Sequence, residues 1–371
     1  MPWPILLMTR RPDLGGTERQ LIEIAKTLDR SKFEPHVGCF QAEGLRRGEL
    51  EAAGVPVVQF PVSSFTSPRV LAEAWRLSRY IRRNDIRLVH TFDFPLAIFA
   101  APTARFFSSA VVVSSQRSHR DLMPRRYRGP LRMTDHLVDA VVVNCEFIQR
   151  HLEREEHVPG RRIRLCHNGV DLGLFRPCAG ARPAALPPHA IVIGVVCVLR
   201  PEKDLTTLLE AFARTRRACS GIKLAIVGSG STLEQLQSEA RARGISEDCI
   251  FEPATAEVAR WYSAMDIFVL PSRSEALSNS LMEAMACGCC AVASNVGGNP
   301  ELVRDGETGF LFEAGDAAGL AATLQRLIEN ESLRKRTGAA AADWIRQRFP
   351  IQASAERMGE IYTELIDRPA G

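Results

Sequence analysis

The chain has 371 residues, more than one hydrophobic core ordinarily supports, so the sequence predicts two domains. Hydrophobic residues make up 46% and charged residues 24%, a globular composition, and no apolar run reaches the roughly 18 residues of a membrane-spanning helix. The net charge of +4 is uneven, because residues up to Asp171 carry 26 Lys and Arg against 19 Asp and Glu, which leaves a small negative balance for the remainder.

The basic first half favours an anionic partner, such as a polyanion or a membrane surface. We expect no nucleic-acid partner, because the chain has no zinc finger, no RNP-type motif and no basic helical face. Three of the ten cysteines, Cys287, Cys289 and Cys290, lie close together in the sequence with no His nearby. This pattern indicates small buried residues in a reducing cytoplasm and no metal site. The first residues, Met-Pro-Trp-Pro-Ile-Leu-Leu-Met, indicate a strand rather than a signal peptide.

Strand-like apolar runs alternate with amphipathic helical segments along the chain. The predicted strands are 5–8, 34–40, 88–90, 110–114, 140–143, 191–198, 223–227, 267–270 and 291–293. The predicted helices are 18–28, 69–84, 145–155, 205–219, 231–243, 281–286, 319–328 and 353–365. This alternation predicts an α/β protein with parallel sheets covered by helices on both faces.

A Pro- and Ala-rich segment without periodicity divides the chain into two α/β halves. We predict a first domain over 1–176, a linker over 177–189 and a second domain over 190–350. The remaining residues, 351–371, contain a predicted helix.

The segment 272–283 is the most informative stretch of the sequence. It places Glu275 in the loop after a buried strand and Glu283 about one turn into the following helix, which Ser278 and Asn279 can open. Ligands of open α/β sheets bind at this edge, and a helix N-terminus there suits a phosphate. Carboxylates beside an anion site can accept hydrogen bonds from hydroxyl groups. The pattern predicts a site for a sugar joined to a nucleoside diphosphate.

Cations follow the first strand of the second half, at Arg200 and Lys203, where they can neutralise a diphosphate. A solvated pair of loop charges is the alternative. Gly228 ends the next strand, and its backbone can approach a ligand or can simply form a turn.

The first half offers weaker candidates. Gly15 and Gly16 open the first helix, where they permit close approach to a phosphate or serve only the turn. Arg117 and His119 follow a strand, and His119 could carry a proton or be structural. A run of four arginines is either a solvated face or a dock for anionic lipid headgroups. These arginines are Arg125, Arg126, Arg128 and Arg132.

Taken in order, the motifs resemble those of the retaining family-four glycosyltransferases of GT-B fold. The matching segments are Gly-Gly-Thr-Glu18, Asn168-Gly-Val-Asp171, Arg200-Pro-Glu-Lys203, Pro271-Ser-Arg-Ser-Glu275 with Glu283, Gly297-Gly-Asn-Pro-Glu301 and Asp305-Gly-Glu-Thr-Gly309. The resemblance implies two Rossmann-like, doubly wound domains facing across a cleft, the second of which binds the nucleotide. It also implies that the C-terminal helix in 351–371 packs back on the first domain.

The resemblance also implies roles for individual residues. Arg200 and Lys203 would neutralise the diphosphate, and Glu275 would bind the sugar hydroxyls. Glu283 would bind the ribose. Gly15, Gly16, Gly228 and the backbone of Ala276, Leu277, Ser278 and Asn279 would complete the donor site. The family usually has Arg where this chain has Val198, and often a His where this chain has Gln116 or Arg117.

The resemblance implies a metal-independent, retaining transfer of a sugar to a glycan or lipid-linked acceptor, in cell-surface polysaccharide or glycolipid biosynthesis. No cofactor is expected besides the nucleotide diphosphate sugar, and the location would be cytoplasmic and peripheral at the inner membrane face. A non-catalytic nucleotide-sugar-binding subunit is one alternative, and a GT-B epimerase or phosphorylase is another. A dehydrogenase is disfavoured, because the chain lacks G-x-G-x-x-G.

Overall fold

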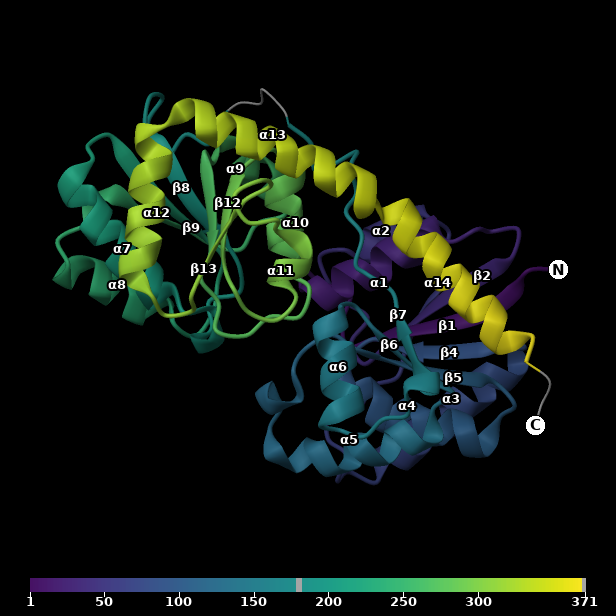
Figure 1. Ribbon diagram of the computed structural model, residues 1–371. Coiled ribbons are helices and arrows are strands. Elements are labelled where there is room, and N and C mark those ends of the chain that lie inside the picture. Colours follow the sequence, from purple (N-terminus) through teal and green to yellow (C-terminus); the bar gives the residue numbers. More distant parts are fainter. Residues whose placement is uncertain (178–181, 369–371) are drawn as a thin grey trace. The chain divides into compact units, whose positions relative to one another are not determined.

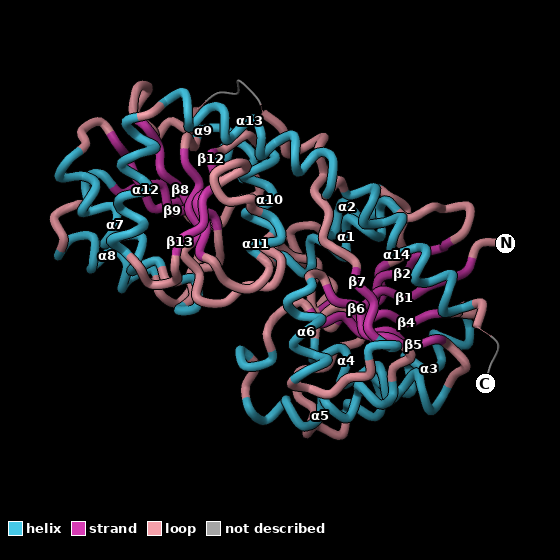
Figure 2. The backbone as a smooth tube through the Cα atoms, in the orientation of Figure 1, coloured by secondary structure: helices cyan, strands magenta, loops and turns pink. Residues whose placement is uncertain are grey.

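The computed structural model describes residues 1–177 and 182–368 and contains two compact units. Unit 1 comprises Met1–Gly169 together with the C-terminal segment from Ile351, and unit 2 comprises Val170–Pro350. Each unit has its own parallel sheet flanked by helices (Figures 1 and 2). Residues 170–176, assigned to the first domain from the sequence, belong with unit 2. Of the predicted linker, 178–181 lie outside the described residues.

Unit 1 is built on a seven-stranded sheet in the order β3-β2-β1-β4-β5-β6-β7, with every pairing parallel. The strands are β1 (Trp3–Thr9), β2 (Phe33–Cys39), β3 (Val57–Gln59), β4 (Leu88–Thr91), β5 (Val111–Gln116), β6 (Ala140–Val143) and β7 (Ile163–Leu165). The helices are α1 (Gly16–Thr27), α2 (Arg47–Ala52), α3 (Arg69–Arg83), α4 (Phe94–Phe107), α5 (Arg125–Leu137), α6 (Glu146–Arg154) and α14 (Ile351–Ile366). The strand order reverses direction at β1, as in a doubly wound fold.

The C-terminal helix α14 belongs to the core of unit 1 although it follows the whole of unit 2 in the sequence. Its buried face packs with β1, α1 and β2, and Tyr362 contacts Phe33 edge to face at 5.9 Å. Figure 1 shows α14 (yellow) running beside α1 and β1. An apolar helix face of this kind is stabilised mainly by its packing rather than by its intrinsic propensity.

A buried chain of polar side chains ties α14 to the sheet. The Tyr362 hydroxyl lies 2.7 Å from His90 Nδ1, and His90 Nε2 lies 2.9 Å from the Ser115 hydroxyl. Burial, together with the charge of Arg117, lowers the pKa of His90 well below its ordinary value, so the imidazole is neutral at pH 7. A neutral imidazole has one donor and one acceptor nitrogen, and the two hydroxyls satisfy both.

We predict that Tyr362→Phe lowers the free energy of unfolding by about 1–3 kcal/mol, because it leaves one nitrogen of buried His90 without a partner. Urea unfolding, monitored by circular dichroism, measures this change. Tyr127→Phe, at a partly exposed tyrosine, is the control. Equal stability of the Tyr362 variant and the wild type would show that the hydroxyl chain does not anchor α14.

Unit 2 contains a six-stranded parallel sheet in the order β10-β9-β8-β11-β12-β13. The strands are β8 (Ile191–Val196), β9 (Ile222–Val227), β10 (Cys249–Glu252), β11 (Ile267–Leu270), β12 (Cys290–Ser294) and β13 (Phe310–Phe312). The helices are α7 (Leu205–Ala218), α8 (Leu233–Ala242), α9 (Val258–Ala264), α10 (Asn279–Ala286), α11 (Asn299–Leu302), α12 (Ala317–Glu329) and α13 (Glu331–Arg348). The central strand β11 is buried along its whole length, which explains its continuous apolar sequence.

The structure confirms the predicted α/β class and each predicted strand and helix, with end points that differ by a few residues. The sequence analysis missed the strands β3, β7, β10 and β13, and the helices α2, α4, α5, α9, α11 and α13. The missed strands are only three or four residues long and lie at or next to the sheet edges, where alternation is too short to recognise. Within the described ranges, no helix is both long and apolar enough to cross a bilayer.

Candidate active site

The loop 271–278 connects β11 to α10 at the carboxyl edge of the unit 2 sheet. The Ser278 side chain caps α10 by accepting a hydrogen bond from the Leu281 N–H at 3.4 Å. Glu275 lies in the loop and Glu283 lies in the second turn of the helix, as the sequence predicts. The first turn of α10 therefore carries the N–H groups and the partial positive charge of a helix N-terminus beside Glu275.

Glu275 forms a largely buried ion pair with Lys203. Lys203 Nζ lies 2.5 Å from Glu275 Oε1, with side-chain exposures of 19% and 10%. Burial alone would lower the pKa of Lys203, but the charge of Glu275 outweighs it and the pKa is raised. The Ser272 hydroxyl donates a second hydrogen bond to the same carboxylate oxygen at 2.7 Å. Lys203 is therefore charged at neutral pH and is held by a fixed carboxylate.

The turn that carries Lys203 is locked to the loop that carries Glu275. Asp204 has a left-handed backbone, with φ of +47°, which is uncommon for a residue other than glycine. Its carboxylate accepts hydrogen bonds from the Thr207 hydroxyl at 2.8 Å and from Arg273 Nε at 2.9 Å. The Arg273 N–H donates to the Glu202 carbonyl. The sequence analysis missed Ser272, Asp204 and Arg273, although Ser272 is three residues before Glu275.

Arg200, the second predicted cation, lies at the same edge but is more exposed. Its side chain is 62% exposed, and its guanidinium lies 3.9 Å from the Glu202 carboxylate. Val198, where the family usually has Arg, is 44% exposed. Arg273 adds a third cation at this edge, 67% exposed and paired with Asp204.

Two glycines allow neighbouring loops to touch at this edge. A Cβ on Gly228 would lie 1.9 Å from the Cys197 carbonyl oxygen, and a Cβ on Gly297 would lie 1.9 Å from the Glu275 carbonyl oxygen. Both glycines have positive φ. Each glycine is required by a close approach of the protein's own backbone, and Gly297 fixes the loop of Glu275 directly.

Glu283 is more deeply placed than Glu275. It is 5% exposed, and its carboxylate accepts a hydrogen bond from the hydroxyl of fully buried Tyr262 at 3.0 Å. Of the predicted backbone donors, Ala276, Leu277 and Ser278 are buried and Asn279 is half-buried. The Ala276 carbonyl accepts a hydrogen bond from the Gly298 N–H at 3.0 Å.

Unit 1 holds the remaining predicted residues. Gly15 and Gly16 stand at the N-terminus of α1, as predicted. Arg117 follows β5 and donates to Asn168 Oδ1 at 2.6 Å, with its guanidinium 4.8 Å from the centre of the Phe92 ring.

Burial lowers the pKa of Arg117 to about 10, which still leaves it charged at neutral pH. Within the described residues, no carboxylate pairs with it, and its Nε atom is buried without a hydrogen bond. Arg117 is therefore a half-buried cation without a carboxylate partner among the described residues.

His119 lies two residues beyond Arg117 but takes part in a different cluster. Its ring centre is 3.8 Å from that of His151 on α6.

The four arginines of the basic run belong to α5. Arg128 pairs with Asp121 at 3.1 Å, and Arg132 pairs with Glu156 at 2.7 Å. These carboxylates offset part of the positive charge, and binding of this helix to an anionic membrane stays a prediction.

Comparison with known proteins agrees with this geometry. The family model described as "Glycosyltransferase Family 4" matches residues 14–174, and the model described as "Glycosyl transferases group 1" matches residues 182–344. Together they cover most of both units. The chain belongs to the family-four glycosyltransferases. The second matched segment, residues 182–344, contains both Lys203 and Glu275.

Two curated relatives illustrate the range of the family. The D-inositol 3-phosphate glycosyltransferase of Thermobispora bispora is 33% identical over 259 residues, which are 66% of this chain and 60% of the relative. A GDP-mannose-dependent alpha-(1-6)-phosphatidylinositol monomannoside mannosyltransferase of Mycobacterium tuberculosis is 28% identical over 83% of each chain. The match spans about half to three fifths of the length of the first curated relatives.

Solved structures show the same fold. Anabaena HepE in complex with UDP and glucose matches 98% of this chain and 100% of its own, with a TM-score of 0.85 and 21% identity. Sucrose-phosphate synthase from Thermosynechococcus elongatus matches with a TM-score of 0.82 and 20% identity, over 98% and 99% of the two chains. The predicted GT-B fold is confirmed.

We predict that Glu275→Gln lowers the free energy of unfolding by about 3 kcal/mol, because it leaves the mostly buried charge of Lys203 without its carboxylate. Denaturant unfolding at pH 7 measures the change. The matched control is Glu331→Gln, since the Glu331–Lys335 pair is exposed and should contribute no more than about 1 kcal/mol. Equal losses in the two variants would contradict a structural role for the buried pair.

Proposed function

We propose that this protein transfers a sugar from a nucleoside diphosphate sugar to a hydroxyl group of an acceptor, with retention at the anomeric carbon. The observation that carries the proposal is the Lys203–Glu275 pair beside the N-terminus of α10, in a chain that belongs to a glycosyltransferase family. It provides a cation for a diphosphate and a carboxylate for sugar hydroxyls at one sheet edge.

The donor diphosphate would bind the cations of unit 2. As the bond between the anomeric carbon and the phosphate oxygen breaks, its electron pair stays on the leaving diphosphate. Lys203, Arg200 and the α10 N-terminus would stabilise this growing negative charge. Because these groups are fixed before the reaction, the loss of one of them typically raises the barrier by about 2.7–4 kcal/mol.

The two carboxylates would orient the rest of the donor. Glu275 accepts hydrogen bonds from Ser272 and Lys203 through one oxygen, Oε1. A carboxylate can accept about four hydrogen bonds in all. Its other oxygen is suited to sugar hydroxyls, with backbone N–H groups from Ala276 to Asn279 nearby. Glu283 would accept from the ribose hydroxyls. Gly228 shapes this edge, and Gly15 and Gly16 are proposed to bring backbone to the diphosphate.

Retention follows when the acceptor attacks from the face that the diphosphate leaves. The acceptor oxygen forms a bond to the anomeric carbon while the phosphate bond breaks, and the acceptor proton passes to the leaving phosphate oxygen. This route requires no protein base. His119 is therefore not needed for the chemical step, and its catalytic role stays a prediction.

The acceptor is proposed to be anionic and to bind unit 1. Arg117 is the basis, because this half-buried cation has no carboxylate partner among the described residues. The names of two relatives include compounds that carry phosphate, D-inositol 3-phosphate and phosphatidylinositol monomannoside. A phosphate-bearing glycan or lipid-linked acceptor at the inner membrane face, in polysaccharide or glycolipid synthesis, fits both observations.

We expect the purified protein to release nucleoside diphosphate from one of the uridine-, guanosine- or adenosine-diphosphate sugars when phosphate-bearing acceptors are supplied. Lys203→Met should lower kcat by about 10²–10³-fold, since it removes one charge contact to the leaving group. Lys335→Met, at an exposed lysine, is the matched control and should leave kcat unchanged.

Two outcomes would contradict the proposal. If donor binds but none is consumed with any acceptor, the protein is a nucleotide-sugar-binding subunit. If the Lys203 and Lys335 variants release nucleotide equally fast, the diphosphate binds elsewhere.

We further expect Arg117→Met to raise KM for a phosphate-bearing acceptor at least ten-fold while KM for the donor stays constant, because Arg117 would contact only the acceptor anion. Initial rates with each substrate varied in turn separate the two constants. Arg161→Met, a basic residue elsewhere in unit 1, is the control. An unchanged acceptor KM would remove Arg117 from the acceptor site.

A further inference from the structure

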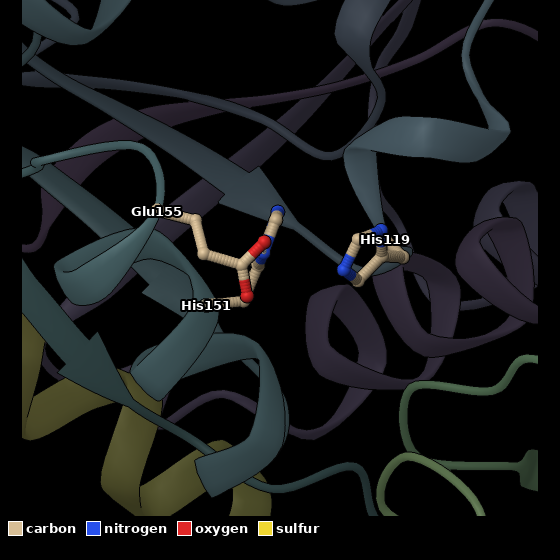
Figure 3. Close-up of side chains that lie close together, drawn as sticks. All are labelled: His119, His151 and Glu155. Carbon is tan, nitrogen blue, oxygen red and sulfur yellow. Dashed lines mark ion pairs between the residues drawn. The ribbon is translucent and has the colours of Figure 1, made fainter.

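A second cluster of polar side chains lies in unit 1, where the segment after β5 meets the C-terminal end of α6. It consists of His119, His151 and Glu155 (Figure 3). One potential ligand atom from each residue lies within 4.8 Å of those of the other two. His151 and Glu155 are four residues apart on one helical face, so the helix itself brings them together.

His151 is the unusual member of the cluster. Its side chain is only 4% exposed, yet neither ring nitrogen makes a hydrogen bond within the described part of the chain. Its Nδ1 atom lies 3.1 Å from Glu155 Oε2, close enough for an ion pair. A buried polar group without a hydrogen bond costs free energy, so its presence calls for a further partner.

The charges around the cluster are compatible with a bound cation. Arg120, which follows His119, pairs with Asp135 at 2.8 Å and Glu156 at 3.2 Å, and Arg150, which precedes His151, pairs with Glu146 at 3.2 Å. His119 Nδ1 accepts a hydrogen bond from the Asp121 N–H at 3.3 Å and lies 3.5 Å from the Asp121 carboxylate. This carboxylate adds negative charge beside the cluster, which favours a bound cation.

We propose that His119, His151 and Glu155 bind a divalent transition-metal ion, with Zn²⁺ the best match. Two imidazoles and one carboxylate are a recognised zinc ligand set, in which water or another group fills the fourth position. Magnesium and calcium prefer oxygen ligands only, so they match this set poorly.

The ligands must move slightly to close on an ion. Tetrahedral zinc with bonds of about 2.0–2.2 Å places its ligand atoms roughly 3.3–3.5 Å apart. The corresponding atoms of the cluster lie up to 4.8 Å apart. Glu155 is exposed and His119 is half-buried, so both can rotate while His151 stays fixed in the core. The bound ion would tie the segment after β5, which also carries Arg117, to α6. It would take no part in the proposed sugar transfer.

The test is a titration of the tag-free full chain with Co²⁺, a spectroscopic substitute for Zn²⁺, followed by displacement with Zn²⁺. We expect one ion per chain, visible absorption bands of a four-coordinate site, and at least ten-fold weaker binding in Glu155→Gln and in His119→Gln. Glu155 is exposed, so its variant should fold normally. Zn²⁺ should also raise the Tm of the wild type but not of Glu155→Gln.

Matched controls remove the same chemical groups nearby. Glu153→Gln alters a carboxylate on the same helix, and His136→Gln removes an exposed histidine of α5. Both should bind Co²⁺ like the wild type. The proposal is overturned if no ion binds, if Glu155→Gln binds as tightly as Glu153→Gln, or if a near-ultraviolet thiolate-to-cobalt band shows that cysteines are the ligands.

Discussion

The buried ion pair between Lys203 and Glu275 is the interaction around which the edge of the unit 2 sheet is arranged. It joins the turn after β8 to the loop after β11, which are far apart in sequence but come from neighbouring parallel strands. Burying two charges is unfavourable unless each is paired and hydrogen-bonded. Here Ser272 supports the carboxylate, and the Arg273–Asp204 pair holds the two loops in register.

Unit 1 depends on a constraint of a different kind, since its core is incomplete without the C-terminal helix. Tyr362 reaches the centre of the sheet and bonds to His90, and Cys166 lies 3.5 Å from the Ser354 carbonyl. The helix also covers apolar side chains of β2, among them Phe33. Unit 1 therefore needs a helix that follows the whole of unit 2 in the sequence.

Much of this organisation could be predicted from the sequence, because it depends on local patterns. The buried run of β11 and the cap at Ser278 correctly predicted that Glu275 lies in the loop after β11 and Glu283 in α10. Two of the helices that were missed contain an internal proline. Helix α4 contains Pro102 and is apolar on most of its surface, so it shows no clear amphipathic period, and α5 contains Pro130.

What could not be predicted is which side chains meet across loops. Nothing in the local sequence shows that Gly297 faces the Glu275 carbonyl rather than a ligand, or that Arg273 pairs with Asp204. The same limit applies to the pair of His119 and His151, which are distant in sequence. They come together because β5 pairs with β6, the strand that leads into α6. Contacts of this type follow from tertiary structure alone.

The resting pair also bears on how the proposed reaction avoids leaving charges unpaired. Lys203 and Glu275 neutralise each other before a donor binds, so neither charge is buried alone. In the proposed complex, the diphosphate would become a partner of Lys203 and the sugar hydroxyls would become partners of Glu275. A ligand with only a phosphate or only a sugar would satisfy one member and leave the other less well paired. The pair would therefore favour a donor that carries both groups, which is the chemistry of a nucleoside diphosphate sugar.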